Sequence, residues 1–435
     1  MTLSMPQFPT LPLLEDVHNE YYHGIQPLRD VGLVCLQHLL ETTGSLFEKL
    51  VQLGLRPENT FVQGKIYSTN SDVVERLRRL GFQNSISERP FRSGHYEMRL
   101  QQDVENLWAA AASVLKSSRV KQVVALDDGG FLLAGVPESI RVAIPVTGVE
   151  QTMGGIALQE AGRVRMPVVQ VATSAGKKLV EPPMIQEAVF RRVSDVAPEF
   201  GSQICGVIGL GSIGRAVLSA LLRTHSRVLV FDRNQLEIEG MLPDGVVMCN
   251  SLQDLFESAE CIFGCTGNDV LNGSSWWKHV PRSKTLISCS SHDKEFRTIL
   301  RDCDEREKNA LDPLADVVVQ TLHGHFKVVR GGFPINFDGS PESVPARDIQ
   351  LTRSLLLGGI IQAATSQFDR TPGYKSIVLD PRLQCLAVNR WFELRPERTI
   401  FYSDEDRQLF SSPEDVAQYG LTTSYVDKPR ELERV

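Results

Sequence analysis

A glycine-rich segment near the middle of the chain has the residue types and spacing of a phosphate-binding turn. Gly209, Gly211 and Gly214 follow the apolar run at 204–208 and open a segment with helical periodicity at 212–222. The first glycine would permit a tight turn, the second would let a pyrophosphate approach the backbone, and the third would let helix and strand pack closely. The unpaired N–H groups at the helix start favour phosphate. We therefore expect the glycines, with Ser212 and Ile213, to bind a dinucleotide.

An acidic residue completes this pattern and indicates which dinucleotide is bound. Asp232 ends the next apolar run, 23 residues after Gly209, where its carboxylate can accept hydrogen bonds from the adenosine ribose hydroxyls. A carboxylate repels the 2′-phosphate of NADP, so the pattern predicts NAD. The neighbouring Arg233 leaves NADP open, and a purely structural glycine turn is the remaining alternative.

The bulk composition narrows the function classes. The chain has 435 residues, a net charge of -7 and 42% hydrophobic residues, which indicates a globular protein of two or three domains. A mildly acidic chain gives no electrostatic reason to expect nucleic acid or an anionic membrane as a partner. Its eight cysteines show no metal-site spacing, so we expect no metal and a reducing cytoplasmic location. No apolar run reaches membrane-spanning length, and the N-terminal segment lacks the basic region of a secretory signal.

Strands and helices alternate along most of the chain, which predicts parallel α/β sheets. A second α/β series begins near residue 204 and continues to about 340, followed by an apolar helix and then a charged stretch with short helices. The expected strands of the first series lie at 30–35, 60–68, 120–126 and 168–172, and the expected helices lie at 38–53, 71–80, 104–115, 183–192 and 349–364.

Short motifs outside the glycine turn are spread along nearly the whole chain. They are LQH at 36–38, KIYSTN at 65–70, LDDGG at 126–130, EQTMG at 150–154, the segment 167–177, GGFPINF at 331–337, YGL at 419–421 and KP at 428–429. In sequence and in order, these motifs resemble those of the adenosylhomocysteinase (S-adenosylhomocysteine hydrolase) family.

The resemblance implies an α/β fold in which a Rossmann-type NAD-binding domain is inserted into a split substrate domain. The substrate domain would comprise residues 1–190 and 350–400, the NAD domain residues 191–349, and a C-terminal extension residues 401–435. Members of this family are usually homo-oligomers, so the resemblance also implies a dimer or tetramer in the cytoplasm.

The family's reaction uses oxidation as a catalytic device. Bound NAD transiently oxidises a ribose 3′-hydroxyl, the thioether is eliminated, water adds and the ketone is reduced again, as in one-carbon metabolism. By resemblance, Lys177 would help deprotonate the 3′-hydroxyl beside Glu181, and Glu150 would bind ribose hydroxyls. Asp128 and His38 would take part in proton transfer. Four of these residues have a structural alternative: a solvated Lys177, a helix-capping Glu150, a plain-turn Asp128 and a capping His38.

The resemblance also assigns further contacts to the cofactor. Thr152 and Asn336 would hold the nicotinamide end. The cofactor cleft would be lined by Thr266, Gly267 and Asn268, and Lys428 would contribute from the C-terminal tail.

Departures from the family motifs cluster at the substrate side. Leu40 and Thr42 replace a family threonine and acid after His38, Ser291 stands in place of a histidine, and segment 339–346 retains only Pro345 of a lid motif. We therefore expect an adenosylhomocysteinase-like hydrolase or lyase acting on a nucleoside thioether or another nucleoside. The alternative is a non-catalytic NAD-binding homologue that regulates or scaffolds a partner. A simple hydroxyacid dehydrogenase is disfavoured because its expected Arg–Glu–His set is not found.

Overall fold

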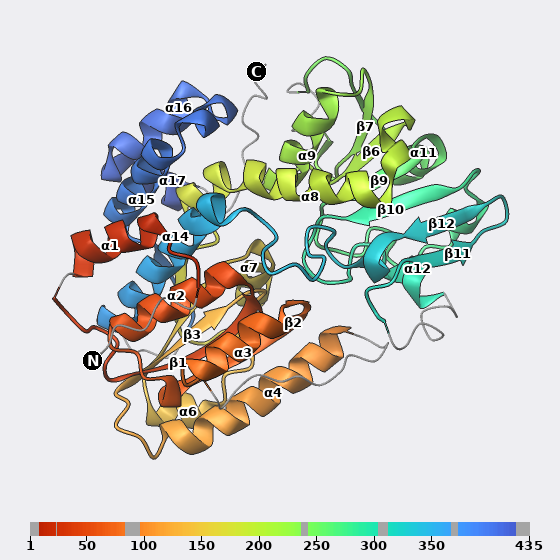
Figure 1. Cartoon of the computed structure of the whole chain (residues 1–435). Helices are drawn as coiled ribbons and strands as arrows, with labels where there is room; N and C mark the ends of the chain where they lie inside the picture. The colour runs from red at the N-terminus through yellow and green to blue at the C-terminus, as the bar shows by residue number, and fades with distance from the viewer. Residues whose placement is uncertain are drawn as a thin grey trace. The chain divides into compact units, whose positions relative to one another are not determined.

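The computed structural model describes residues 8–22, 24–82, 96–235, 242–302, 312–366 and 373–422 (Figure 1). The chain forms two compact units. Of the described residues, the first unit contains those up to 82, Met98–Glu181 and those from Gly339 to Thr422. The second contains Pro182–Asp338 together with Tyr96 and Glu97. In the sequence, the second unit therefore interrupts the first.

The first unit is built on a six-stranded sheet in which the paired strands are parallel. The strand order is β13-β5-β4-β3-β1-β2. Its inner strands β1, β3 and β4 are buried on both faces, as expected for a parallel sheet covered by helices, whereas the edge strand β13 is partly exposed. The strands are β1 (Val31–Leu39), β2 (Thr60–Thr69), β3 (Gln122–Asp127), β4 (Val146–Glu150), β5 (Pro167–Gln170) and β13 (Lys375–Val378).

One long helix, α14 (Ala346–Thr365), forms much of the cover of this sheet and packs against β3, β4 and β5. It is buried along nearly its whole length, so it carries apolar residues on all sides rather than on one stripe. The other helices with residues in this unit are α1 (Pro12–Tyr22), α2 (Glu41–Gln52), α3 (Ser71–Arg79), α4 (Tyr96–Leu115), α5 (Phe131–Ala134), α6 (Glu138–Ala143), α7 (Met153–Glu160), α15 (Pro381–Leu394), α16 (Asp404–Gln408) and α17 (Pro413–Thr422).

The second unit is built on a seven-stranded sheet of order β11-β12-β10-β9-β6-β7-β8, parallel except for the β11–β12 pair. Its core includes Val207, Phe263 and Ile287 from three neighbouring strands. The strands are β6 (Cys205–Ile208), β7 (Val228–Phe231), β8 (Val246–Met248), β9 (Cys261–Gly264), β10 (Lys284–Ser288), β11 (Val317–Gln320) and β12 (His325–Val328). The helices are α8 (Pro182–Val196), α9 (Ser212–Leu222), α11 (Leu252–Ser258) and α12 (Arg297–Arg301).

Each sheet has a point where the direction of strand addition reverses. In the first sheet the chain leaves β1 toward β2 and then returns to place β3 on the other side of β1. In the second sheet it leaves β6 toward β7 and β8 and returns to place β9 beside β6. Ligands of open parallel sheets bind outside the carboxyl ends of the strands at such points. The topology therefore marks two positions to examine, after β1 and β3 and after β6 and β9.

The α/β fold with a Rossmann-type unit is confirmed. The strand expected at 60–68 is present as β2, and the helix expected at 349–364 is present as α14. The expected helix at 38–53 starts too early, because β1 continues to Leu39 and α2 begins only at Glu41. The predicted domain boundaries at 190 and 349 fall within α8 and α14, whereas the chain changes unit at Pro182 and Gly339.

None of the helices in the described ranges is long and apolar enough to cross a membrane. The described residues also contain no group of three or more His, Cys, Asp or Glu side chains that could hold a metal ion.

Candidate functional site

An irregularity at the carboxyl end of β1 and β2 brings polar side chains together. The pairing of the two strands is regular to Gln37 and resumes only at Leu39, which pairs with Thr69. The extra residues of β2 bulge out between these pairs. Bulges of this kind re-aim side chains and are frequent beside active sites. Here the bulge brings Ser68 to His38, with 2.5 Å between Ser68 Oγ and His38 Nδ1.

Asp128 connects the polar side chains at this edge. It follows β3, directly across the switch point from β1, and is almost fully buried. Its Oδ2 lies 3.1 Å from His38 Nε2, and Gln151 donates a hydrogen bond to the same oxygen. Its Oδ1 forms an ion pair with Lys65, whose side chain is 0% exposed. Asp128 thus joins a histidine, a lysine and an amide in one connected network.

The electrostatics of this network favour an ionised aspartate beside a neutral histidine. Burial alone would raise the pKa of Asp128, but the Lys65 ammonium and the His38 imidazole hold it well below its usual value. Burial lowers the pKa of His38, and the attraction of Asp128 only partly offsets this effect. A neutral imidazole hydrogen-bonded to a carboxylate can accept a proton, which is the property required of a general base. The His38 side chain is also 13% exposed, so it remains within reach of a ligand.

A second pair of carboxyl groups at this edge favours the protonated form. Asp127 and Glu150 are register partners on β3 and β4, and both are fully buried. Burial raises the pKa of Asp127 to about 7. Burial, reinforced by the charge of Asp127, raises the pKa of Glu150 well above its usual value. The two acids therefore hold at least one proton near neutral pH, close to Asp128.

The Glu150 carboxylate is fixed by the start of α7. Its Oε1 accepts hydrogen bonds from the backbone N–H and the hydroxyl of Thr152, each at 2.8 Å. A Cβ atom on Gly155 would lie 2.0 Å from Glu150 Oε2, so only glycine leaves room for this carboxylate. Glu150 thus accepts both bonds from Thr152, the N-cap residue of α7. Its predicted contact with ribose hydroxyls stays a prediction.

Lys177 and Glu181 meet on one short turn after β5. Both lie at the π-helical turn Gly176–Val180 or directly after it, a wide turn that is frequent at functional sites. Lys177 Nζ forms an ion pair with Glu181, and the Thr352 hydroxyl on α14 donates to Glu181 Oε1 at 2.7 Å. The Lys177 side chain is 15% exposed. The predicted lysine–carboxylate pair is therefore present, and its lysine is accessible.

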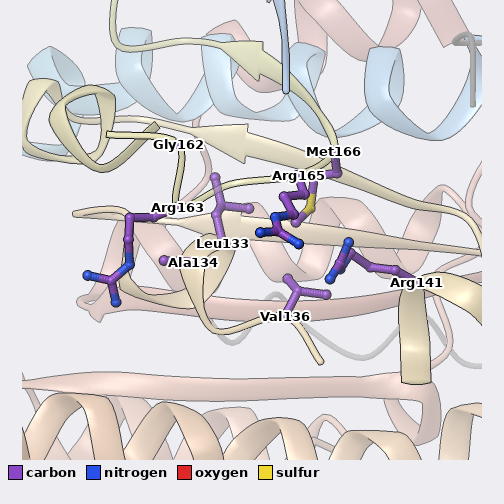
Figure 2. A pocket seen from close by; sticks show the side chains of 8 residues that line it. All are labelled: Leu133, Ala134, Val136, Arg141, Gly162, Arg163, Arg165 and Met166. Carbon is purple, nitrogen blue, oxygen red and sulfur yellow. The ribbon is translucent and has the colours of Figure 1, made fainter. Parts of the chain in front are cut away.

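A pocket of about 270 Å³ lies at the opposite edge of the first sheet, at the amino ends of β4 and β5 (Figure 2). Arg141, Arg163 and Arg165 line it with apolar residues, and none of its lining residues is acidic. In Figure 2 the guanidinium groups of Arg141 and Arg165 point toward one another, while that of Arg163 points away. A site with neither a general base nor a proton donor of suitable pKa is poorly suited to acid–base catalysis. The carboxyl edge is therefore the candidate catalytic site of this unit.

In the second unit, the glycine turn after β6 fits a dinucleotide. Gly209 has a φ of 86°, which favours glycine, and a Cβ on Gly214 would lie 1.8 Å from the Gly209 carbonyl oxygen. A Cβ on Gly211 would meet no atom within 4 Å, which leaves open space beside the backbone there. Helix α9 begins at Ser212, followed by Ile213, and has no side-chain cap. The N–H groups of its first turn are thus not capped by a side chain and can bind phosphate.

Asp232 lies at the end of β7, where a ribose-binding acid is needed. It accepts hydrogen bonds from the backbone N–H groups of Leu210 at 2.7 Å and Asn234 at 2.9 Å. A carboxylate has further lone pairs, so these bonds leave acceptor capacity for ribose hydroxyls. The first bond also fixes the acid to the glycine turn. Arg233 beside it is exposed, and its possible contact with a 2′-phosphate stays a prediction.

The turn after β9 is held by a buried glutamate. The N–H groups of Thr266 and Gly267 donate to the two oxygens of Glu295, each at 2.8 Å. Asn268 is exposed and bonds back to Thr266. A Cβ on Gly264 would lie 2.2 Å from Glu295 Cγ, so this carboxylate also depends on a glycine. Because the two N–H groups are already occupied, any cofactor contact of this turn would use other atoms.

Two other predicted cofactor residues have different surroundings. Asn336 is buried and follows Ile335, whose N–H bonds to the carbonyl of Ser288 at the carboxyl end of β10. Thr152 belongs to the first unit, and its hydroxyl donates to Glu150. Lys428 lies outside the described residues. The cofactor contacts of these three residues stay predictions.

Several residues of the first-unit site were not singled out from the sequence as site residues. Lys65 lies inside a strand, and a lysine within an otherwise buried strand is the signal that could have identified it, because buried lysines are rare unless paired. Ser68 and Gln151 gave no such signal, because small polar residues are ordinary at strand ends. Arg353 and Glu342 come to this edge from distant sequence, so their position depends on the tertiary fold.

Comparison with known proteins bears first on the second unit. Residues 204–333 match the sequence model of the NAD binding domain of 6-phosphogluconate dehydrogenase. The cofactor is NAD. This match covers the glycine turn, Asp232 and the turn after β9, so the NAD prediction from the sequence is confirmed.

Over a longer stretch, the chain is similar to uncharacterized proteins of two strains of Mycobacterium tuberculosis, H37Rv and CDC 1551. It is 31% identical to each over 345 residues, which cover 79% of this chain and 66% of the relative. The chain thus spans somewhat less than two thirds of the length of these curated relatives.

Among solved structures, a Granulicella formate dehydrogenase matches 68% of this chain and 82% of its own, with 13% identity and a TM-score of 0.34. The D-lactate dehydrogenase of Escherichia coli matches 63% of this chain and 79% of its own, with 13% identity and a TM-score of 0.32.

The expected membership of the adenosylhomocysteinase family is wrong, and so is the expected reaction at a nucleoside thioether. The matching sequence model is that of a dehydrogenase's NAD-binding domain. The physical reason is that the shared motifs are short and lie at strand ends. Turns such as the LDDGG segment at 126–130 recur wherever parallel strands end, because glycine and aspartate satisfy the backbone there. Such motifs indicate the fold rather than the reaction.

Proposed function

We propose that this protein is an NAD-dependent oxidoreductase that interconverts a hydroxyl group and a carbonyl group on a small molecule. The observation that carries the proposal is the presence of an NAD-binding unit together with a separate acid–base network, centred on Asp128, at the switch point of another parallel sheet. Oxidation of an alcohol needs both parts. Bound NAD supplies a hydride acceptor, and the hydroxyl proton needs a base.

In this proposal, His38 takes the hydroxyl proton. Its imidazole is neutral because burial lowers its pKa, and Asp128 stabilises the imidazolium that forms. The hydroxyl of Ser68, 2.5 Å from His38 Nδ1, can relay the proton between the substrate and this nitrogen. His38 takes the proton of the hydroxyl as the carbonyl forms, and NAD, when held by the glycine turn and Asp232, would accept the hydride from the substrate carbon.

Lys177 has a different role in the proposal. Its ammonium, held by Glu181, donates a hydrogen bond to the substrate oxygen and stabilises negative charge that develops there. The pair lies on the same sheet edge, after β5, and α14 fixes its carboxylate through Thr352. A charged donor positioned in advance costs no reorganisation during the reaction, which is why this pair suits the role.

The experiment is a turnover screen of the full chain with NAD and a panel of hydroxy acids, sugar alcohols and simple alcohols, followed by the absorbance of NADH. We expect at least one class to reduce NAD, and His38→Gln to lower kcat by about 100-fold or more, the usual contribution of a general base. Lys177→Met should also lower kcat. Arg165→Gln at the amino edge is the matched control and should leave turnover unchanged.

The outcomes separate clearly. NAD binding without NADH formation from any compound of the panel would contradict the proposal, as would full activity of His38→Gln. A bell-shaped dependence of kcat/KM on pH whose lower limb disappears in His38→Gln would support the assigned base.

A further inference from the structure

One buried positive charge at the carboxyl edge of the first sheet is not used by the proposed chemistry. Arg353 lies on α14, one residue after Thr352, and is 4% exposed. Its Nε donates to the hydroxyl of Thr42 at 3.0 Å. Within the described ranges, no carboxylate lies within ion-pair distance of Arg353, and its two terminal nitrogens have no hydrogen-bond partner. A buried charge without a partner is costly, so this arrangement needs an explanation.

The acids nearest to this guanidinium are engaged elsewhere. Glu342, Glu181 and Asp128 act on Arg353 electrostatically, but burial still lowers the pKa of the arginine. Glu181 is paired with Lys177, and Asp128 with Lys65 and His38.

The third acid, Glu342, is fixed by backbone groups. Its carboxylate accepts from the N–H groups of Thr42 at 2.9 Å and Ser343 at 3.3 Å. Thr42 thus holds Glu342 through its N–H and Arg353 through its hydroxyl, without bringing the two charges into contact. The charge of Arg353 is therefore compensated only at a distance.

The position of the guanidinium connects it with the proposed base. Arg353 is close enough to His38 to help lower the pKa of the imidazole. The neighbouring Thr352 contacts Glu181, the partner of Lys177. Because Nε donates to Thr42, the two terminal nitrogens of the guanidinium remain as a pair of hydrogen-bond donors at its end. Two parallel donors match the two oxygens of a carboxylate or of a phosphate group.

We infer that Arg353 binds an anionic group of the substrate, a carboxylate or a phosphate, while His38 and Lys177 act on its hydroxyl. This inference rests on the proposed function, because it names the substrate class of the same site. The bound anion supplies the missing counter-charge, and its position fixes which carbon of the substrate is oxidised. Neutral alcohols of the same size are then poor substrates.

The first test measures binding and does not depend on turnover. Malonate and inorganic phosphate are added separately to the full chain, and the thermal unfolding midpoint Tm is followed. We expect one of the two anions to raise Tm in the wild-type protein, which distinguishes carboxylate from phosphate recognition. Arg353→Met should abolish the shift, and Arg353→Lys should retain part of it because the charge remains. Arg165→Met at the amino edge is the matched control and should keep the full shift.

The second test uses matched substrates in the NADH assay. A hydroxy acid is compared with its methyl ester, and a sugar phosphate with the free sugar alcohol. We expect Arg353→Met to lower kcat/KM for the anionic member by about 100-fold or more, as when one partner of a buried charge pair is lost. The neutral member should be nearly unaffected.

Three results would overturn the inference. They are equal kcat/KM for the anionic and neutral members in the wild type, an equal loss for both in Arg353→Met, and no Tm shift with either anion. If the anions bind through Arg353 but no compound reduces NAD, the proposed oxidoreductase function fails while the anion site stands. If Arg353→Met does not fold, Arg353→Lys carries both comparisons.

Discussion

The two parallel sheets share one topological device but differ in what they present at their carboxyl edges. Each sheet reverses its direction of strand addition, between β1 and β3 in one and between β6 and β9 in the other. At the first reversal the chain places ionisable side chains, including His38, Lys65 and Asp128. At the second it places glycines and backbone N–H groups.

This difference follows from the ligand that each edge can serve. A dinucleotide is recognised through its phosphates and ribose, so the second edge needs close backbone approach and one acid, Asp232. Proton transfer needs side chains whose pKa values differ. The first edge accordingly has an ionised Asp128 next to Asp127, whose pKa is raised. The same fold can therefore carry either task, and the residues at the switch point decide which one it performs.

The largest effect is expected when the central charge of the first edge is removed. Asp128→Ala leaves the fully buried Lys65 ammonium without its partner, so we expect the free energy of unfolding to fall by about 3–5 kcal/mol. Urea denaturation measures this loss. The exposed pair of Asp30 and Lys121 is the control, since Asp30→Ala should change stability little. Similar losses for both variants would mean that the buried network stabilises the fold no more than an exposed ion pair does.

The corresponding test of the second edge is steric. Gly214→Ala places a methyl group 1.8 Å from the Gly209 carbonyl, so the turn must shift. Overpacking of this kind costs about 1–3 kcal/mol, and we expect NAD binding to weaken by about 10-fold or more. Calorimetric titration with NAD measures the Kd. Gly201→Ala, where a Cβ meets no atom within 4 Å, should bind NAD normally. Unchanged affinity in Gly214→Ala would show that this glycine is not required for the turn.

The pH dependence of stability distinguishes the two aspartates of the first edge. The folded state raises the pKa of Asp127 from 3.8 to about 7, so it binds a proton that the unfolded state releases within this range. The free energy of unfolding should therefore fall as pH rises from about 4 to about 7, by about 1.4 kcal/mol for each pH unit in this range. Asp128, with its lowered pKa, contributes in the opposite direction, and its stabilisation is lost as pH falls.

Asp127→Asn isolates the first of these contributions. The amide oxygen can still accept the hydrogen bond from the Leu133 N–H, but it cannot ionise. Denaturation curves at several pH values should show a smaller loss of stability between pH 4 and 7, within the range that Asp127 titrates. Parallel pH profiles for variant and wild type would contradict the assigned shift.

The smallest expected effect concerns cofactor choice at the second edge. Asp232→Asn keeps an acceptor for the Leu210 N–H but removes the charge that repels a 2′-phosphate. The ratio of the Kd values for NADP and NAD should fall roughly 10-fold. Arg233→Gln is the matched variant, and it should change this ratio in the opposite direction or not at all. An unchanged ratio in Asp232→Asn would place the discrimination elsewhere.

The second edge was the more predictable of the two. The glycine turn, α9 and Asp232 are contiguous in sequence, so spacing alone identified them and the cofactor. The first edge is assembled from five strands and a distant helix. Lys65 and Arg353 reach it only through the bulge of β2 and the packing of α14, which no local pattern reveals.

The wrong family assignment has the same origin. The motifs around Asp128 and Glu150 resemble signatures of one reaction. Their residue types, however, are those that satisfy the backbone where a parallel strand ends. In the structure, Glu150 accepts hydrogen bonds from Thr152 at the start of α7, and Glu295 accepts two from the turn after β9. An acid in such a motif can thus reflect the backbone groups that it satisfies, and only its partners indicate whether it is available for chemistry.

The two carboxylates that sit over glycines have a consequence for mutational tolerance. A Cβ on Gly155 would collide with Glu150, and one on Gly264 would collide with Glu295. Neither glycine needs an unusual backbone conformation, yet each substitution displaces a buried acid. In a saturation mutagenesis scan, substitutions at these two glycines should therefore have the same effects as replacement of Glu150 and Glu295. Positions that bear no functional group would then be scored as essential.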